Sequence, residues 1–157
     1  MLYLDDIKVE FESQGFKGTH IGISPNKDKS VLFLESVKST QTVRCPYCGG
    51  SVYIYENGQV ELKDIPIWRG TTHIWNFFIH RYQCNCCHET FTEEIHFKYP
   101  GIRITYRAAN WIKGFLQQKI SIKAIQELTG IHWDTIRKVQ REIMDEAIWK
   151  REKMLRE

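Results

Sequence analysis

The chain has 157 residues, of which 42% are hydrophobic and 26% are charged. This length and composition are typical of one medium domain or two to three small ones, and they exclude a large multidomain enzyme and wholesale disorder. Lys and Arg total 22 against 19 Asp and Glu. The excess lies in residues 103–157, which hold 12 basic and 7 acidic residues, and it predicts a surface there that faces a polyanion.

Membrane insertion and export are not expected. The longest strongly apolar stretch, Ile74 to Ile79, is far shorter than the roughly 20 residues that a spanning helix needs. Asp5, Asp6 and Glu10 stand where a secretory signal requires a basic start and an apolar run. We therefore expect a cytoplasmic protein without a membrane partner.

The N-terminal segment, residues 1–43, reads as β structure. Ile7 to Phe11 alternates apolar and polar residues. Strong turn residues at Pro25 to Asp28 separate two β-like runs, Thr19 to Ser24 and Ser30 to Val37. These features predict a hairpin that packs and positions the rest of the chain.

Five cysteines fall in two clusters, and two Cys-x-x-Cys pairs can be drawn among them: Cys45 with Cys48, and Cys84 with Cys87. An odd number of clustered cysteines argues against a disulfide framework. Two such turns can aim four thiolates at one tetrahedral ion with bonds of about 2.3 Å. The spacing therefore predicts one structural zinc ion.

The second pair leaves the choice of ligands open. Cys86 offers a competing thiolate, and His88 stands where a glycine would help the turn and could itself substitute as a ligand. The first pair, with Pro46 and Tyr47 between the cysteines, also matches the dithiol motif of glutaredoxins. That chemistry needs Cys45 at a helix N-terminus, whereas Gly49, Gly50 and a β-like run follow it. A dithiol oxidoreductase is thus a weaker alternative.

Residues 44–100 read as an antiparallel zinc ribbon. Strand-like runs cover 51–55, 59–62 and 71–82, and Asn57-Gly58 is a strong hairpin signal between the first two. The core of so small a segment depends heavily on its metal. Four aromatic residues on these strands are expected in the core: Trp68, Trp75, Phe77 and Phe78.

After Pro100-Gly101 the periodicity becomes helical, over residues 103–144. Thr105 is placed to cap a first helix and Ser121 a second, and Thr129-Gly130 supplies the turn before a third that begins near Trp133. Residues 145–157 read as a helix extension or linker. The apolar stripe of the first helix contains Ala108, Trp111, Ile112, Phe115 and Leu116, and that of the second contains Ile122, Ile125 and Leu128.

Two short helices joined by a glycine turn, with a basic second helix, are the layout of a helix-turn-helix DNA reader. Helical geometry places Lys138 and Arg141 on the side of the helix opposite Ile136. It places Arg137 on the flank between these two sides. Trp133 lies beside the apolar stripe and is expected to pack. The predicted DNA-binding residues are Thr135, Arg137, Lys138 and Arg141, with Lys119 and Lys123 as phosphate contacts. The alternative without DNA binding is a solvated charged face on an ordinary helical bundle.

The order of these parts resembles the N-terminal region of ISL-three family insertion-sequence transposases. The resemblance rests on the segment Cys45-Pro46-Tyr47-Cys48-Gly49, on Lys63 to Trp68, on Arg81 to Glu93 with its cysteines, and on Trp133 to Ile136. It implies an α+β chain in which a β hairpin and a zinc ribbon precede a helix-turn-helix. His88 and Gln126 depart from the pattern, which has Gly and Ala there.

The resemblance implies a portion of a transposase that binds transposon ends on double-stranded DNA. The family's DDE nuclease domain would follow the last residue, so we expect no catalytic activity from this chain. A second copy or the full-length transposase is the expected protein partner. A stand-alone DNA-binding regulator or a transposition inhibitor is the main alternative, and a zinc hydrolase or a protein-binding ribbon is a weaker one.

Overall fold

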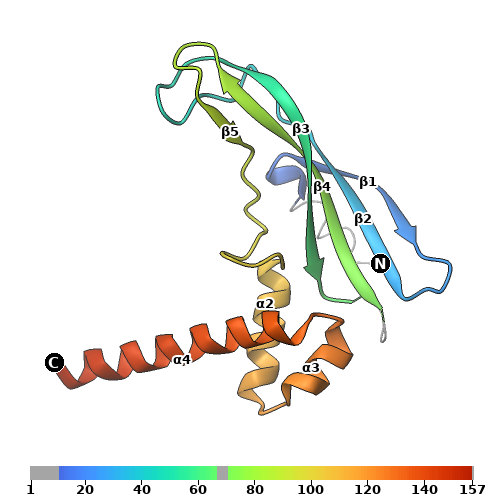
Figure 1. Ribbon diagram of the computed structural model, residues 1–157, viewed down its shortest axis with the longest axis vertical. Helices are drawn as coiled ribbons and strands as arrows, with labels where there is room; N and C mark the ends of the chain where they lie inside the picture. Colours follow the sequence, from blue (N-terminus) through green and yellow to red (C-terminus); the bar gives the residue numbers. More distant parts are fainter. Residues whose placement is uncertain (1–10, 67–70, 157) are drawn as a thin grey trace. The chain divides into compact units, whose positions relative to one another are not determined.

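The computed structural model describes residues 11–66 and 71–156 (Figure 1). The expected strand at Ile7 to Phe11 lies outside this part of the chain except for Phe11, which is helical. The predicted core residue Trp68 also lies outside it. Within the described residues the chain is a mixture of helices and one β-sheet, so the predicted α+β class is confirmed.

The sheet takes its strands from both of the predicted β segments. Its order is β1-β2-β4-β3, and β5 pairs with β4 in antiparallel register, with Tyr82 opposite Phe91. The predicted hairpin is present as β1 and β2, and its turn contains Lys27 at a φ of 55°. The strands are β1 (Phe16–Ile23), β2 (Lys29–Ser36), β3 (Val52–Asp64), β4 (Thr72–Cys84) and β5 (Thr90–Thr92).

The predicted turn at Asn57-Gly58 is wrong, because β3 runs through it without a break. Gly58 does not adopt the positive φ that such a turn requires. The neighbouring strand β4 is also 13 residues long and lies beside β3 in the opposite direction (Figure 1). The Asn57 side chain meets His80 Nδ1 of β4 at 2.9 Å. Pairing along the whole partner strand outweighs the local preference for a turn.

Aromatic rings fill the interior beside the sheet. Phe16 and Phe77 pack edge to face with ring centroids 5.0 Å apart, and Phe11 meets Trp75 in the same way at 4.8 Å. Trp75 and Phe77 are buried, as predicted, whereas Phe78 is only half-buried. Trp75 and Phe77 therefore stabilise the sheet and are not available to stack on bases.

The described residues form two compact units that cut across the predicted segments. The first contains residues up to 23, 31–62 and 74–96, and the second contains 24–30, 63–73 and the chain from 97 onward. The N-terminal β segment and the predicted ribbon share the first unit because their strands belong to one sheet. The links between strands belong with the helices in the second.

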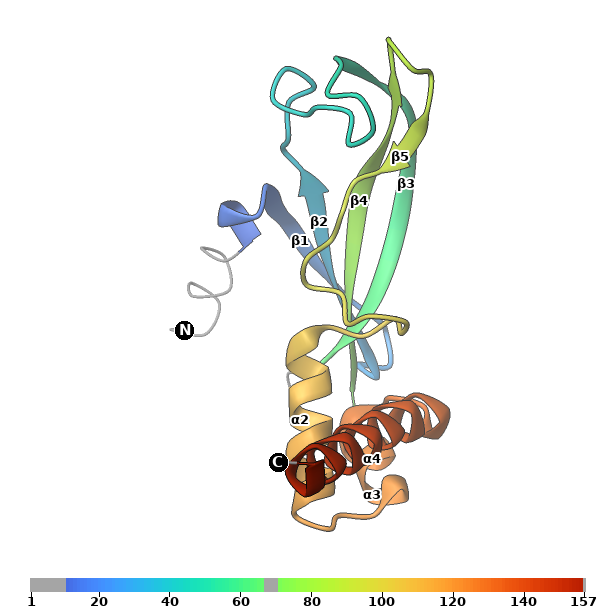
Figure 2. The same cartoon turned by 90° about the vertical axis from the view of Figure 1, so that its left-hand side faces the viewer.

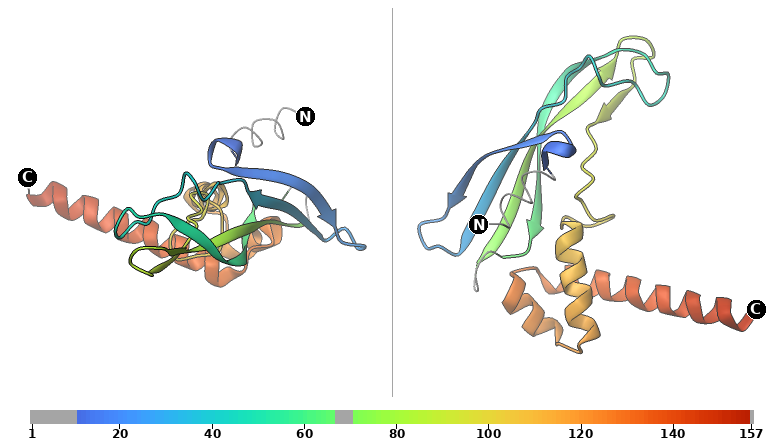
Figure 3. Two further views of the ribbon diagram at one scale, coloured as in Figure 1. Left: turned by 90° about the horizontal axis from the view of Figure 1, so that it is seen from above. Right: turned by 180° about the vertical axis from the view of Figure 1, so that it is seen from behind.

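Three helices make up most of the second unit: α2 (Tyr106–Gln117), α3 (Ile122–Thr129) and α4 (Trp133–Arg156). Thr105 and Ser121 cap α2 and α3 as predicted, since each side chain accepts a backbone N–H three residues later. Figure 2 shows α4 crossing α2, and Figure 3 shows its C-terminal half extending past the other two helices. The core of this unit includes Ala109, Ile112, Ile125, Ile136 and Val139.

Three apolar residues that were expected to pack lie at the surface. Trp111 is 50% exposed, Leu128 is 38% exposed and Trp133 is 42% exposed. On α2 and α3 the buried faces are rotated toward Ala109 and Thr129, which are fully or almost fully buried. Small residues allow close helix contact, so the core takes those sides and leaves the larger side chains outside.

Gly130 is the turn between α3 and α4, and we expect Gly130→Ala to destabilise the protein. Its φ of 67° disfavours any L side chain, and an added Cβ would lie 2.5 Å from Thr72 Oγ1. The expected loss is about 1–3 kcal/mol of unfolding free energy, measured by urea denaturation. Gly114→Ala on α2, where a Cβ meets nothing within 4 Å, is the control and should be neutral or stabilising. Equal effects of the two substitutions would contradict this account.

Candidate metal centre and nucleic-acid interface

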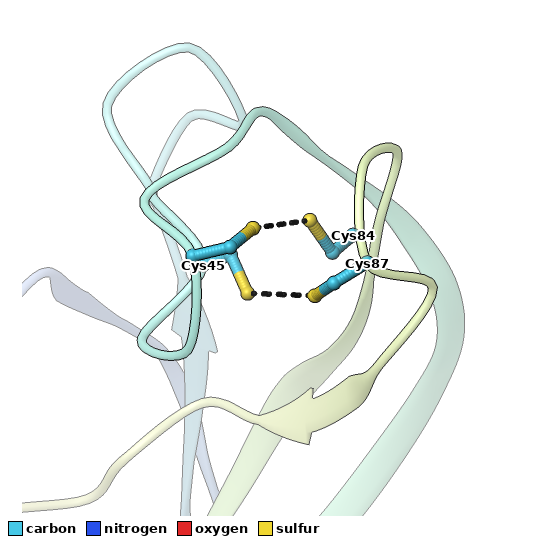
Figure 4. A group of neighbouring side chains, drawn as sticks. Cys45, Cys84 and Cys87 are labelled. Carbon is cyan, nitrogen blue, oxygen red and sulfur yellow. Dashed lines mark hydrogen bonds between the residues drawn. The ribbon is translucent and has the colours of Figure 1, made fainter.

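Four cysteines from two distant parts of the chain meet at one end of the sheet (Figure 4). Their sulfur atoms all lie within 4.8 Å of one another. The Sγ atoms of Cys45 and Cys87 are 3.6 Å apart, and those of Cys48 and Cys84 are 3.4 Å apart. The prediction that these four residues share one site is confirmed, and the group could hold a metal ion.

The two Cys-x-x-Cys turns have matching backbone conformations. The N–H of Cys45 bonds to the carbonyl five residues later, at 3.0 Å, and the N–H of Cys84 does the same. Gly49 has a φ of 71°, and His88, at the equivalent place in the second turn, has a φ of 59°. His88 thus adopts the left-handed conformation that a glycine would take more easily, and the departure in sequence leaves the turn intact.

The donor set fits a tetrahedral ion. Four sulfurs at about 2.3 Å from a central ion would be about 3.8 Å apart, close to the two measured pairs. Gly50 contributes space, because a Cβ there would lie 3.2 Å from Cys48 Sγ and 3.3 Å from Cys84 Sγ. Tetrahedral sulfur ligands are typical of zinc or iron. Four protein ligands leave no open position for a substrate, so the site is suited to structural work.

Backbone N–H groups favour a thiolate in this cluster. The backbone N–H of Cys87 lowers the pKa of the Cys84 thiol, and the N–H of Cys86 lowers it further. Burial raises this pKa, but the hydrogen bonds outweigh it and the resulting pKa is about 6. The N–H of Gly50 also lowers the pKa of Cys48, but the thiols of Cys84 and Cys87, burial and Cys45 raise it to about 12. Without a metal, the sulfurs therefore share their protons unequally.

The structure shows where Cys86, His88 and the dithiol motif lie relative to the four sulfurs. Cys86 is exposed and lies outside the group of four sulfurs, and its backbone N–H points to Cys84 Sγ at 3.3 Å. His88 likewise lies outside the group. Cys45 begins a turn and not a helix. The helix dipole that dithiol catalysis requires is absent at this position.

The first half of α4 separates a buried face from a basic one. Ile136 and Val139 are fully buried, whereas Arg137, Lys138 and Arg141 are exposed. Among the residues that the structure describes, none of these three basic side chains forms an ion pair. This face therefore carries positive charge that no carboxylate of the described residues neutralises.

The other predicted DNA-binding residues are distributed around this face. Lys123 is exposed on the first turn of α3, and Lys119 is exposed in the link that precedes it, with a φ of 59°. Thr135 is half-buried on the first turn of α4. Asp134, which would weaken the positive charge, lies with its carboxylate 3.4 Å from His132 Nδ1.

Gln126 has a role that the sequence did not indicate. Its side-chain Oε1 accepts the backbone N–H of Trp133, the first residue of α4, at 3.1 Å. The first N–H groups of a helix lack partners within the helix. Gln126 therefore fixes the start of α4 against α3, which a small alanine at that position could not do.

A buried polar network supports α2 and was also missed. Asp64, at the end of β3, is fully buried. It accepts a hydrogen bond of 2.6 Å from Thr105 Oγ1 and pairs with the Arg107 guanidinium. His73 lies nearby, and its own burial lowers its pKa despite the charge of Asp64. The network thus joins the capping residue of α2 to the end of a strand.

No family model, curated protein or solved structure matches the chain. None of the helices in the described part of the chain combines the length and the apolar character needed to cross a membrane.

Proposed function

We propose that the chain is a zinc-stabilised module that binds double-stranded DNA through α4. The single observation that carries this proposal is the exposed row of Arg137, Lys138 and Arg141, unpaired within the described residues, on the back of a fully buried helix face. Basic side chains that neutralise phosphates displace counterions, and this supplies most of the affinity of DNA-binding modules.

The arrangement of α3 and α4 supports major-groove binding. The two helices are joined by the left-handed Gly130 and share a core that includes Ile125 and Ile136. In helix-turn-helix modules the second helix enters the major groove and its N-terminal residues meet base edges. Arg137 and Arg141 would then contact bases or backbone, and Lys119, Lys123 and Lys138 would contact phosphates.

A zinc ion is the metal that this role requires. Zinc has no redox chemistry and takes four thiolates in closed structural sites. Held by Cys45, Cys48, Cys84 and Cys87, it would fix the end of the sheet and take no part in a reaction. We assign no catalytic step to the described residues.

The order of motifs favours transposon ends as the DNA target. The resemblance to the N-terminal region of ISL-three transposases implies a zinc ribbon followed by a helix-turn-helix. The four clustered cysteines and the helices that follow them along the chain support this proposal. A stand-alone DNA-binding regulator or transposition inhibitor would use the same surface. A preference for the terminal inverted repeats of a neighbouring element distinguishes the transposase role from regulation at a promoter.

Alanine substitutions of Arg137 and Arg141 test the proposal. Each is expected to weaken binding to a duplex of the element end by about 5- to 150-fold, since a base contact is worth about 1–3 kcal/mol. Loss of a phosphate contact instead weakens all duplexes alike and lowers the slope of log K against log salt by about 0.9. Fluorescence anisotropy over a salt series measures both effects.

Lys150→Ala is the matched control, because Lys150 is also exposed on α4 but lies beyond the proposed surface. Its affinity should stay close to that of the wild type. Equal affinity of wild type and Arg137→Ala for every duplex, at every salt concentration, would refute DNA binding by α4.

A further inference from the structure

An exposed indole ring lies directly beside one of the unpaired arginines. Trp133 is the first residue of α4, and Arg137 follows one turn later on the same side. The guanidinium carbon of Arg137 is 5.3 Å from the centre of the Trp133 ring. This distance is within the range of an attractive cation–π contact, for which tryptophan is the best partner.

The indole is itself held in place. The backbone N–H of Trp133 is bound by Gln126, and the His132 ring lies against the indole with centroids 5.6 Å apart. A shallow hollow at the surface is lined by Trp133 and Arg137 of α4 and by four residues of α3: Ile122, Lys123, Gln126 and Glu127. The ring thus sits on a fixed part of the helix and faces solvent.

Bidentate recognition of guanine requires a planar guanidinium in a defined orientation. An exposed arginine has many rotamers, and fixing one of them costs conformational entropy. Within the described residues no carboxylate pairs with Arg137, so the indole is the group in contact with it that can limit this freedom. A guanidinium that lies flat on the indole would keep the N–H edge of its fork free for a base.

We propose that Trp133 is a positioning residue that orients Arg137 for bidentate contact with guanine in the major groove. The inference rests on the proposed function and names the base pair that the first turns of α4 read. Trp133 would contribute to specificity and little to general affinity, because it carries no charge.

The test begins with selection of duplexes from a randomised library by the wild-type chain. Affinities are then measured for the selected duplex and for versions with each G·C pair replaced in turn. Wild type should discriminate against replacement of one G·C pair by roughly tenfold or more. Trp133→Ala should lose most of this discrimination at that position alone, and its salt slope should stay the same.

Three further variants separate orientation from folding. Trp133→Leu keeps apolar bulk without a π face and should lose discrimination like Trp133→Ala, whereas Trp133→Phe should retain most of it. Arg137→Lys keeps the charge and should lose discrimination with an unchanged salt slope. In an Arg137→Ala background, Trp133→Leu should have no further effect on discrimination, because the two residues act as one unit. Circular dichroism checks that each variant is folded.

Each negative result has a separate meaning. Unchanged discrimination in folded Trp133→Leu would overturn the role of Trp133 and leave DNA binding intact. The same conclusion would follow if Trp133→Leu reduced discrimination as much in the Arg137→Ala background as in the wild type. If the wild-type chain enriches no duplex at all, the proposed function fails, and the inference that rests on it fails too.

Discussion

Cys48→Ser is expected to release the metal ion and to unfold the end of the sheet that carries the cysteines. Among the described residues, the hydrophobic cluster at that end has four buried members, Cys45, Val52, Tyr82 and Cys84, and two of them are proposed ligands. So small a core cannot be stable alone. Metal binding to four thiolates contributes about 10 kcal/mol or more at neutral pH. Its loss should therefore remove the structure of this region.

Elemental analysis and hydrogen exchange measure the two effects separately. The wild type should carry a single zinc ion and protect the backbone N–H groups of Cys45 and Cys84, and the variant should do neither. Cys86→Ser is the matched control, since Cys86 lies one residue from Cys87 but outside the group of sulfurs. It should keep both zinc and protection. Retention of zinc by Cys48→Ser would contradict the assignment of ligands. Iron in the wild-type protein would show that the site binds iron and not zinc.

Asp64→Ala is expected to be the most destabilising single substitution in the second unit. The carboxylate is fully buried and accepts from Thr105 Oγ1 and from Arg107 Nε, at 2.6 and 3.2 Å. Removing one partner of such a pair leaves a charge without compensation and costs about 3–5 kcal/mol. The Thr105 hydroxyl, which also caps α2 through the N–H of Ala108, would lose its own acceptor. A fall in Tm of about 6–20 °C follows for a chain of this size.

An exposed ion pair within the sheet provides the control for this second prediction. Glu56 and Arg81 lie on neighbouring strands with their charged atoms 3.5 Å apart, and both are exposed to solvent. Glu56→Ala should cost no more than about 1 kcal/mol, because solvent screens the pair. Calorimetry of the two variants compares them directly. A loss from Asp64→Ala as small as that from Glu56→Ala would show that the buried network does not stabilise α2.

The features predicted correctly are those set by residues close together in the sequence. A Cys-x-x-Cys turn aims two thiolates in the same direction whatever surrounds it, so Cys45 and Cys48 could be assigned as a pair from spacing alone. Helix caps are equally local, because the side chains of Thr105 and Ser121 bond to N–H groups three residues away. The start of α4 near Trp133 was also predicted locally, from the turn at Thr129-Gly130.

Several predictions failed where a distant partner decided the outcome. Asn57-Gly58 has the residues of a turn, but β3 is hydrogen-bonded to β4 in the sheet and stays extended through this segment. The exposure of Trp111 and Leu128 depended on which side of each helix allows the closest packing, and helical periodicity alone could not show this.

The sequence by itself determined the cysteine turns, the helix starts and the concentration of basic residues near the C-terminus, because each depends on neighbours along the chain. Only the tertiary structure decided that β3 runs unbroken and that Asp64 reaches Arg107 across 43 positions in the sequence. It also placed the Trp133 ring at the surface beside Arg137. Contacts of this kind depend on how folded elements pack, and local preferences do not specify that packing.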